Sequence, residues 1–276
     1  METLLAALPA GIDPWTAGGL LAVSFLASLV TAAMGLGGGL LMLAVLAGAL
    51  PPAALIPVHG IVQLGSNLGR TVLFRRSTRY RVLLWFALGA AVGVSIGAGV
   101  AVNLPRPVLL VVVAAFILVS TWAPRLGSRP VPERGFLAVG AATAFISMFV
   151  GATGPFLAPF LSPERLGDRQ ATIGTMAACM SLKHGLKVAA FAATGFVFLP
   201  WLPFAAAMIA TGFLGSLAGR AVVVRLPALG GFGELALDAT VGAVVYAIVA
   251  LVLNAAGVRD VAGRLLRQAR NRSATA

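Results

Sequence analysis

Two lines of polar side chains run through otherwise apolar stretches of the sequence, with members four residues apart. The first line comprises His59, Gln63 and Asn67, with Arg70 close to the same face, and the second comprises Thr175, Cys179, Lys183 and Lys187. Residues at this spacing share one face of a helix. Because the lines contain amides, hydroxyls and basic groups but no carboxylate, they favour anions and repel cations.

Each polar line follows a glycine-rich break, at residues 35–39 and 151–155. Each glycine costs a helix about 1 kcal/mol relative to alanine, and Pro155 removes a backbone donor. A helix that resumes after a break presents free N–H groups and its positive dipole end, which can hold an anion. The candidate ligands in the breaks are Gly35, Gly37, Gly38, Gly39, Gly151, Thr153 and Gly154. Close helix packing through small residues is the alternative.

The composition places both lines inside a membrane. The chain has 276 residues, of which 59% are hydrophobic and 10% are charged, whereas soluble domains carry about 25% charged residues. The apolar runs of about 20 residues match the length of a helix that crosses a bilayer. The net charge of +12 comes mainly from arginines at the ends of these runs, which indicates membrane topology rather than nucleic-acid binding.

The sequence therefore predicts an all-α integral membrane protein with about eight transmembrane helices. The expected spans are 15–33 with a second piece at 40–50, 53–74, 82–102, 108–122, 136–150 with a second piece at 156–161, 171–195, 196–224 and 235–258. They define an N-terminal segment at 1–14, a first repeat at 15–123, a connector at 124–135, a second repeat at 136–258 and a basic tail at 259–276.

The two predicted halves repeat each other. An offset of 116 residues aligns the breaks and places Asn67 on Lys183, and an offset of 122 places Gly93 on Gly215. Internal duplication is common in secondary transporters, and the repeats run either parallel or, if each break turns the chain back, inverted.

Arginine placement favours the parallel arrangement. In that arrangement thirteen arginines, in 70–81, 125–134 and 259–272, share one side, which the positive-inside rule makes the cytoplasm together with both termini. The opposite side then receives Arg106, Arg165, Arg169, Arg220 and Arg225.

The remaining patterns concern packing and the absence of enzyme motifs. Glycines in 89–97 and 212–219 predict close-packed helix faces, within one protomer or between the two protomers of a homodimer. The sequence has no metal-ligand cluster, nucleophile elbow or phosphate-binding loop. We therefore expect a protein that is not an enzyme and uses no cofactor or metal.

The segments 33–39 and 151–156, together with the four-plus-four duplication, resemble the TauE/SafE family of sulfite exporters, the TSUP membrane permeases. The resemblance covers about residues 15–256 and implies a permease of the bacterial inner membrane that moves sulfur-containing anions. The sequence departs from the family pattern at residues 57–59, where small hydroxyl residues are usual, and at Pro155.

We therefore expect a secondary transporter that moves sulfite or organosulfonates by alternating access. The breaks would offer N–H groups near the midplane, and Gln63, Asn67 and Thr153 would hydrogen-bond the anion. Lys183 and His59 would supply positive charge, and Arg70 and Lys187 would draw anions to the cytoplasmic mouth. The expected partners are the small anion and the lipid bilayer, without nucleic acid. The alternatives are an anion channel and a non-transporting membrane scaffold.

Overall fold

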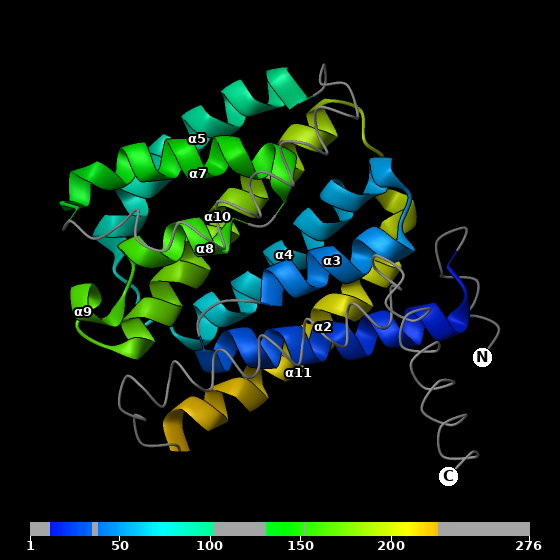
Figure 1. The fold of residues 1–276 in the computed structure, drawn as a ribbon, viewed down its shortest axis with the longest axis horizontal. Coiled ribbons are helices and arrows are strands. Elements are labelled where there is room, and N and C mark those ends of the chain that lie inside the picture. The colour runs from blue at the N-terminus through cyan, green and yellow to red at the C-terminus, as the bar shows by residue number, and fades with distance from the viewer. Residues whose placement is uncertain (1–11, 35–37, 102–130, 152, 226–276) are drawn as a thin grey trace, which may run out of the picture. The chain divides into compact units, whose positions relative to one another are not determined.

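The computed structural model describes residues 12–34, 38–101, 131–151 and 153–225, which form helices joined by turns (Figure 1). The long helices are α2 (Pro14–Met34), α3 (Gly38–Ala49), α4 (Pro52–Leu73), α5 (Tyr80–Ala101), α7 (Phe136–Val150), α10 (Arg169–Ala193) and α11 (Leu202–Arg225). The short ones are α8 (Gly154–Leu157), α9 (Pro163–Leu166) and the 3-10 turns Glu133–Gly135, Ala158–Phe160 and Leu199–Trp201. None of these described residues lies in a strand, and the expected fourth and eighth spans fall outside them.

Four segments of the described chain are long and apolar enough to cross a bilayer. They are Pro14–Ala33, Tyr80–Val100, Glu133–Val150 and Leu199–Ala221. Helix α4 has 22 residues and α10 has 25, so at 1.5 Å per residue they extend about 33 and 38 Å and are also long enough. These two helices are less apolar because they carry the two polar lines.

Glycine faces hold the apolar helices together in pairs, α11 against α2 and α5 against α7 (Figure 1). Gly215 lies so close to the carbonyl of Phe25 that a Cβ would overlap it, and Gly93 lies in the same way against the carbonyl of Ala141. Gly215 and Gly93 are separated by the offset of 122, and Phe25 and Ala141 by the offset of 116. The third helix of each predicted half therefore packs on the first helix of the other half.

The long helices form two groups of three that run in opposite directions. Along α11, Gly212 faces Ser24 and Gly219 faces Ala33, so α2 and α11 are parallel. Helix α4 joins them in the same direction, since Gly65 faces Ile209 and Gly69 faces Phe213. We call α2, α4 and α11 the first group.

The second group consists of α5, α7 and α10. Helices α5 and α7 are parallel, since Gly89 faces Leu137 and Gly97 faces Met148. Helix α10 begins at the same end as α5, where the backbone N–H of Arg79 donates to the Thr175 hydroxyl at 2.9 Å.

The two groups meet where α4 packs antiparallel against α10. Gly60 lies next to Val188 near the start of α4, whereas Gly174 lies against Phe74 beyond its end. The Thr71 and Ser181 hydroxyls join these helices at 3.2 Å. Helices at corresponding positions of the predicted halves, such as α4 and α10, therefore run in opposite directions. The parallel arrangement expected from the arginines is wrong for the described helices, which have the inverted one.

The first break between helices is shorter than the expected 35–39. Gly38 and Gly39 lie in the first turn of α3 rather than in the break, and residues 35–37 are outside the described residues. The Gly38 N–H donates to the Thr31 hydroxyl at 3.0 Å, and a Cβ on Gly38 would overlap the carbonyl of Ala27. This glycine therefore lets α3 turn back closely along α2.

The second break starts where predicted but is shorter than the predicted 151–155, because Gly154 and Pro155 lie in α8. Helix α7 ends at Val150, and Gly151 has φ +82°, a conformation that favours glycine. The expected second piece at 156–161 is the end of α8 followed by a 3-10 turn. These short elements lead to α9 and back to the end at which α7 began.

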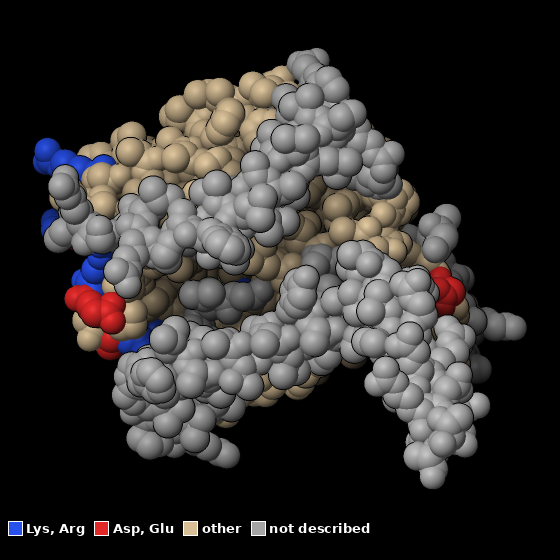
Figure 2. Space-filling view, in the orientation of Figure 1, with Lys and Arg blue, Asp and Glu red and all other residues tan. Residues whose placement is uncertain are grey.

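The arginines whose side chains are described gather at one end of the helix groups, here called the arginine end (Figure 2). Arg79 donates to the Leu166 carbonyl at 2.7 Å, Arg169 donates to the Ala33 carbonyl, and the Arg220 guanidinium lies over the Phe74 ring. Arg165, Arg169 and Arg220 were expected on the side opposite Arg79. They share its end because the inverted arrangement brings the starts of α5, α7 and α10 together with the ends of α2, α4 and α11.

Helix α10 begins at a side-chain cap. The Asp168 carboxylate accepts a hydrogen bond from the Ala171 N–H at 2.7 Å. Removing such a cap costs about 1 kcal/mol. Asp168→Ala should therefore lower the thermal unfolding temperature in detergent, whereas Gln170→Ala, at an exposed position of the same turn, should not. Equal unfolding temperatures for the two variants would show that the cap adds no stability.

Candidate functional site

Two buried lysines of α10 bind the break between α7 and α8. The Lys183 ammonium donates to the Thr153 hydroxyl, and the Lys187 ammonium donates to the Gly151 carbonyl at 3.0 Å. Both lysine side chains are 0% exposed. They lie about 21 and 27 Å along α10 from its start at the arginine end, well inside a helix about 38 Å long. The second half thus places two basic groups at membrane depth.

The local sequence explains why the break can receive these lysines. The positive φ of Gly151 ends α7 and leaves its carbonyl free for Lys187. Thr153 precedes α8 and makes no capping hydrogen bond with its side chain, so its hydroxyl is free to accept from Lys183. Backbone outside a helix is tolerated at membrane depth when it is buried in protein or faces a wet cavity.

The polar line of α4 forms a second chain of hydrogen bonds. His59 lies 3.0 Å from the Gly39 carbonyl through Nε2, and Asn67 donates to the Gln63 carbonyl at 2.7 Å. The Arg70 guanidinium donates to Asn67 Oδ1 at 2.8 Å and to the Ser66 hydroxyl at 3.1 Å. Gln63 lies against Gly39 in the first turn of α3. All of these α4 side chains are buried.

The two lines come together where α4 crosses α10. The rings of His59 and His184 are 5.8 Å apart and nearly perpendicular. A Cβ on Gly60 would lie 3.5 Å from Cδ of Lys187, so the lysine stem runs close to α4 at this glycine. The site therefore has four nitrogen bases, His59, Lys183, His184 and Lys187, between the two helix groups.

The ionisable side chains of this site within the described part of the chain are mainly basic. No described carboxylate lies within ion-pair distance of Lys183 or Lys187, since the described acidic groups are at the two ends of the helices. Isolated buried charges cost several kcal/mol each unless they are compensated. The arrangement can therefore bind an anion, which would supply the opposite charge.

Several predicted site residues serve other roles. The Thr175 hydroxyl accepts from the Arg79 backbone and lies about 12 Å along α10 from Lys183, at the arginine end. Cys179 is buried among the apolar side chains of the second group. Gly154 starts α8 and has Met180 as its neighbour. Gly35 and Gly37 lie outside the described residues.

The two residues expected at the cytoplasmic mouth are both buried. Lys187 is further from the arginine end than Lys183, so it lies inside the site and does not reach the membrane interface. Arg70 is nearer the arginine end and is 3% exposed. Its hydrogen bonds with Asn67 and Ser66 make it an extension of the polar line of α4 toward that end.

His184 and Ser66 belong to the site but were outside the predicted lines. His184 directly follows Lys183, and Ser66 directly precedes Asn67. A spacing of four residues selects a narrow face of a helix, whereas the contact between α4 and α10 covers a wider one. A search for any polar residue that flanks the lines would have found both.

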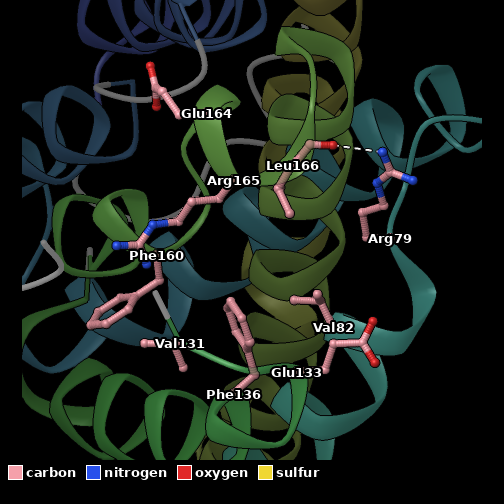
Figure 3. Close-up of a pocket in the computed structure, with 9 residues that line it drawn as sticks. All are labelled: Arg79, Val82, Val131, Glu133, Phe136, Phe160, Glu164, Arg165 and Leu166. Carbon is pink, nitrogen blue, oxygen red and sulfur yellow. Dashed lines mark hydrogen bonds between the residues drawn. The ribbon is translucent and has the colours of Figure 1, made fainter. Parts of the chain in front are cut away.

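A separate cavity of about 490 Å³ lies at the arginine end, between α5, α7 and α9 (Figure 3). Its lining combines apolar groups such as Val82 and Phe136 with Arg79 and Glu164. A hydrogen bond from the Ser162 hydroxyl holds the pKa of Glu164 below its usual value, so this carboxylate is ionised at neutral pH. Neither buried lysine lines the cavity, and its mixed charge gives no preference for anions.

The helices and the buried basic site define a multi-pass helical membrane protein. The sequence model of the sulfite exporter TauE/SafE family matches residues 20–252, and the chain belongs to this family. The family is described as one of sulfite exporters, which are membrane transporters. No curated protein and no solved structure is significantly similar to the chain.

Proposed function

We propose that this protein is a secondary transporter of sulfur-containing anions, such as sulfite or organosulfonates, in the bacterial inner membrane. The observation that carries the proposal is the pair of fully buried lysines, Lys183 and Lys187, which have hydroxyl and carbonyl partners but no described carboxylate beside them. The anion binds between these ammonium groups and the polar line of α4. Gln63, Asn67 and Thr153 supply hydrogen bonds to its oxygens.

Alternating access is supported by the division into two helix groups. The site lies at the contact of α4 and α10, so a rocking motion of one group against the other would open it to one side and then the other. The repeated offsets of the glycine contacts support a duplicated unit of four spans in each half, eight in all. We also propose that the first repeat ends at residue 123, that the second begins at residue 136, and that the protein forms a homodimer.

The membrane orientation follows from the arginine end. The positive-inside rule makes this end cytoplasmic. Asp13 and Trp15 lie at the start of α2, whose other end carries Ala33 and meets Arg169. The start of α2 is therefore external in this proposal, which replaces the cytoplasmic position that we expected for the N-terminal end.

Cysteine labelling should reveal this orientation. Trp15 is 92% exposed, Arg76 is exposed, and the single native thiol, Cys179, is buried. A membrane-impermeant maleimide should label Trp15→Cys in intact spheroplasts and label Arg76→Cys only after permeabilisation. The reverse pattern would contradict the orientation, and the parent protein, with Cys179 alone, is the control for background labelling.

The proposed function is tested by thermal unfolding of the detergent-purified protein against sulfite, sulfate, thiosulfate, sulfoacetate, taurine, chloride and acetate. An anion at 100 times its dissociation constant should add about 2.7 kcal/mol to the free energy of unfolding. We expect sulfite or a sulfonate to raise the unfolding temperature, and chloride and acetate to have little effect. A folded protein that responds to none of the sulfur anions would contradict the proposal.

A further inference from the structure

The His59 ring has a defined proton arrangement. Its Nε2 lies 3.0 Å from the Gly39 carbonyl, which can only accept a hydrogen bond, so Nε2 carries the proton. The other nitrogen, Nδ1, is then an unprotonated acceptor. It is buried and has no hydrogen-bond partner among the described residues. A basic lone pair is thus held at membrane depth, and no described residue donates to it.

His184 repeats this feature from the facing helix. Its Nδ1 is also buried and lacks a partner within the described part of the chain. The rings of His184 and His59 form an edge contact at 5.8 Å between centroids, and the two side chains are 2% and 0% exposed. An unpaired buried polar group costs about 1–3 kcal/mol, so two such nitrogens on neighbouring rings are a feature that packing alone does not favour.

The charged groups around this pair are all basic among the residues that the structure describes. Helix α10 contributes Lys183 and Lys187, and α4 contributes Arg70, all close enough to interact electrostatically with His184. The remaining titratable group nearby in the described ranges is Cys179, on α10. The other facing elements, α3 and the break between α7 and α8, present the Gly39 and Gly151 carbonyls and the Thr153 hydroxyl.

Protonation of the pair is therefore linked to anion binding. In a buried site of low dielectric, a proton on either ring is repelled by the ammonium groups. An anion beside Lys183 offsets the field of the ammonium groups and so favours that proton. By reciprocity of linked binding, a proton on the pair then strengthens anion binding by the same factor.

We propose that His59 and His184 form a proton-binding pair that takes up one proton when an anion binds beside Lys183, so that the transporter moves both in the same direction. This inference rests on the proposed function. The proton comes from water on the side where the anion arrives, and an N–H bond forms at a ring lone pair. After the site opens to the other side that bond breaks, and the proton leaves to water with the anion.

Isothermal titration of the detergent-purified protein tests the pair directly. Sulfate, thiosulfate and methanesulfonate are titrated near neutral pH, where these anions do not exchange protons themselves. Each titration is repeated in two cationic buffers, Tris and bis-Tris, whose ionisation heats differ and which carry no sulfonate. The difference in heat per bound anion gives the proton uptake. We expect about one proton per anion in the unmodified protein.

Replacement of both histidines separates the pair from the lysines. His59→Gln with His184→Gln keeps polar side chains but removes the titrating rings, and uptake per bound anion should fall close to zero even if binding weakens. The single variants provide the same measurement if the double variant does not fold. Anion binding without proton uptake in the unmodified protein, or proton uptake that persists in the double variant, would overturn the proposal of a proton-binding pair. Either result would leave the proposed function standing. An absence of binding by all three anions would overturn the proposed function, and the pair with it.

Discussion

Replacement of Lys183 by methionine should reduce sulfur-anion flux at least about 30-fold, because loss of one partner of a buried charge pair costs 2 kcal/mol or more. The same change should leave the free energy of unfolding of the anion-free protein unchanged or raised. Lys183 is fully buried without a described carboxylate, and methionine has a similar length and no charge to desolvate. Flux into proteoliposomes and thermal unfolding in detergent measure the two effects.

Measured together, flux and unfolding distinguish a lysine that binds the substrate from a lysine with a structural role. Gln170→Met, on the exposed side of the same helix, is the matched control and should change neither quantity. Lys187→Met should behave as Lys183→Met does, since both ammonium groups serve the same break. A Lys183→Met protein that transports normally would remove this residue from the site. One that unfolds would indicate a mainly structural role for its bond with Thr153.

The second large effect concerns the glycine faces. Gly215→Ala should destabilise the protein by about 3 kcal/mol, because a Cβ cannot fit against the Phe25 carbonyl and the overlap is with backbone that cannot turn away. Helices α2 and α11 would have to separate along their whole contact. The amount of folded protein after purification and its thermal unfolding temperature measure the loss.

A glycine of the same pair of helices provides the comparison. No described atom lies within 4 Å of a Cβ placed on Gly19, so Gly19→Ala should be neutral or gain up to about 1 kcal/mol in helix propensity. Gly93→Ala, at the related contact with Ala141, should resemble Gly215→Ala. If Gly215→Ala were as stable as Gly19→Ala, the close approach of α2 and α11 would be wrong.

Element positions could be predicted from the sequence where apolar runs are uninterrupted. Helix α7 occupies the predicted 136–150, and α5, Tyr80–Ala101, begins two residues before the predicted 82–102. The direction of the repeats could not be predicted, because an offset of 116 residues aligns two halves equally well in either direction. The count of arginines then favoured the parallel arrangement, because that arrangement places the arginines of the tail at 259–272 on the same, cytoplasmic side as those at 70–81.

The candidate site, too, could be predicted only in part, because the sequence does not show how the helices pack. The four-residue spacing correctly indicated that each polar line lies on one buried helix face. It did not show that α4 and α10 are antiparallel, so Thr175, at the end of its line, lies near Arg79 rather than near His59. Lys183 and Thr153 are thirty positions apart and meet only because Gly151 turns the chain. Such contacts depend on tertiary packing, which the periodicity of one helix does not contain.

The most direct test of the central claim is the uptake of radiolabelled sulfite into proteoliposomes that contain the purified protein. The account predicts saturable uptake that sulfonates or thiosulfate compete with, that chloride does not, and that Lys183→Met largely abolishes. Uptake that stays proportional to sulfite concentration would indicate a channel. No uptake above that of protein-free liposomes, from protein shown to be folded, would contradict the account.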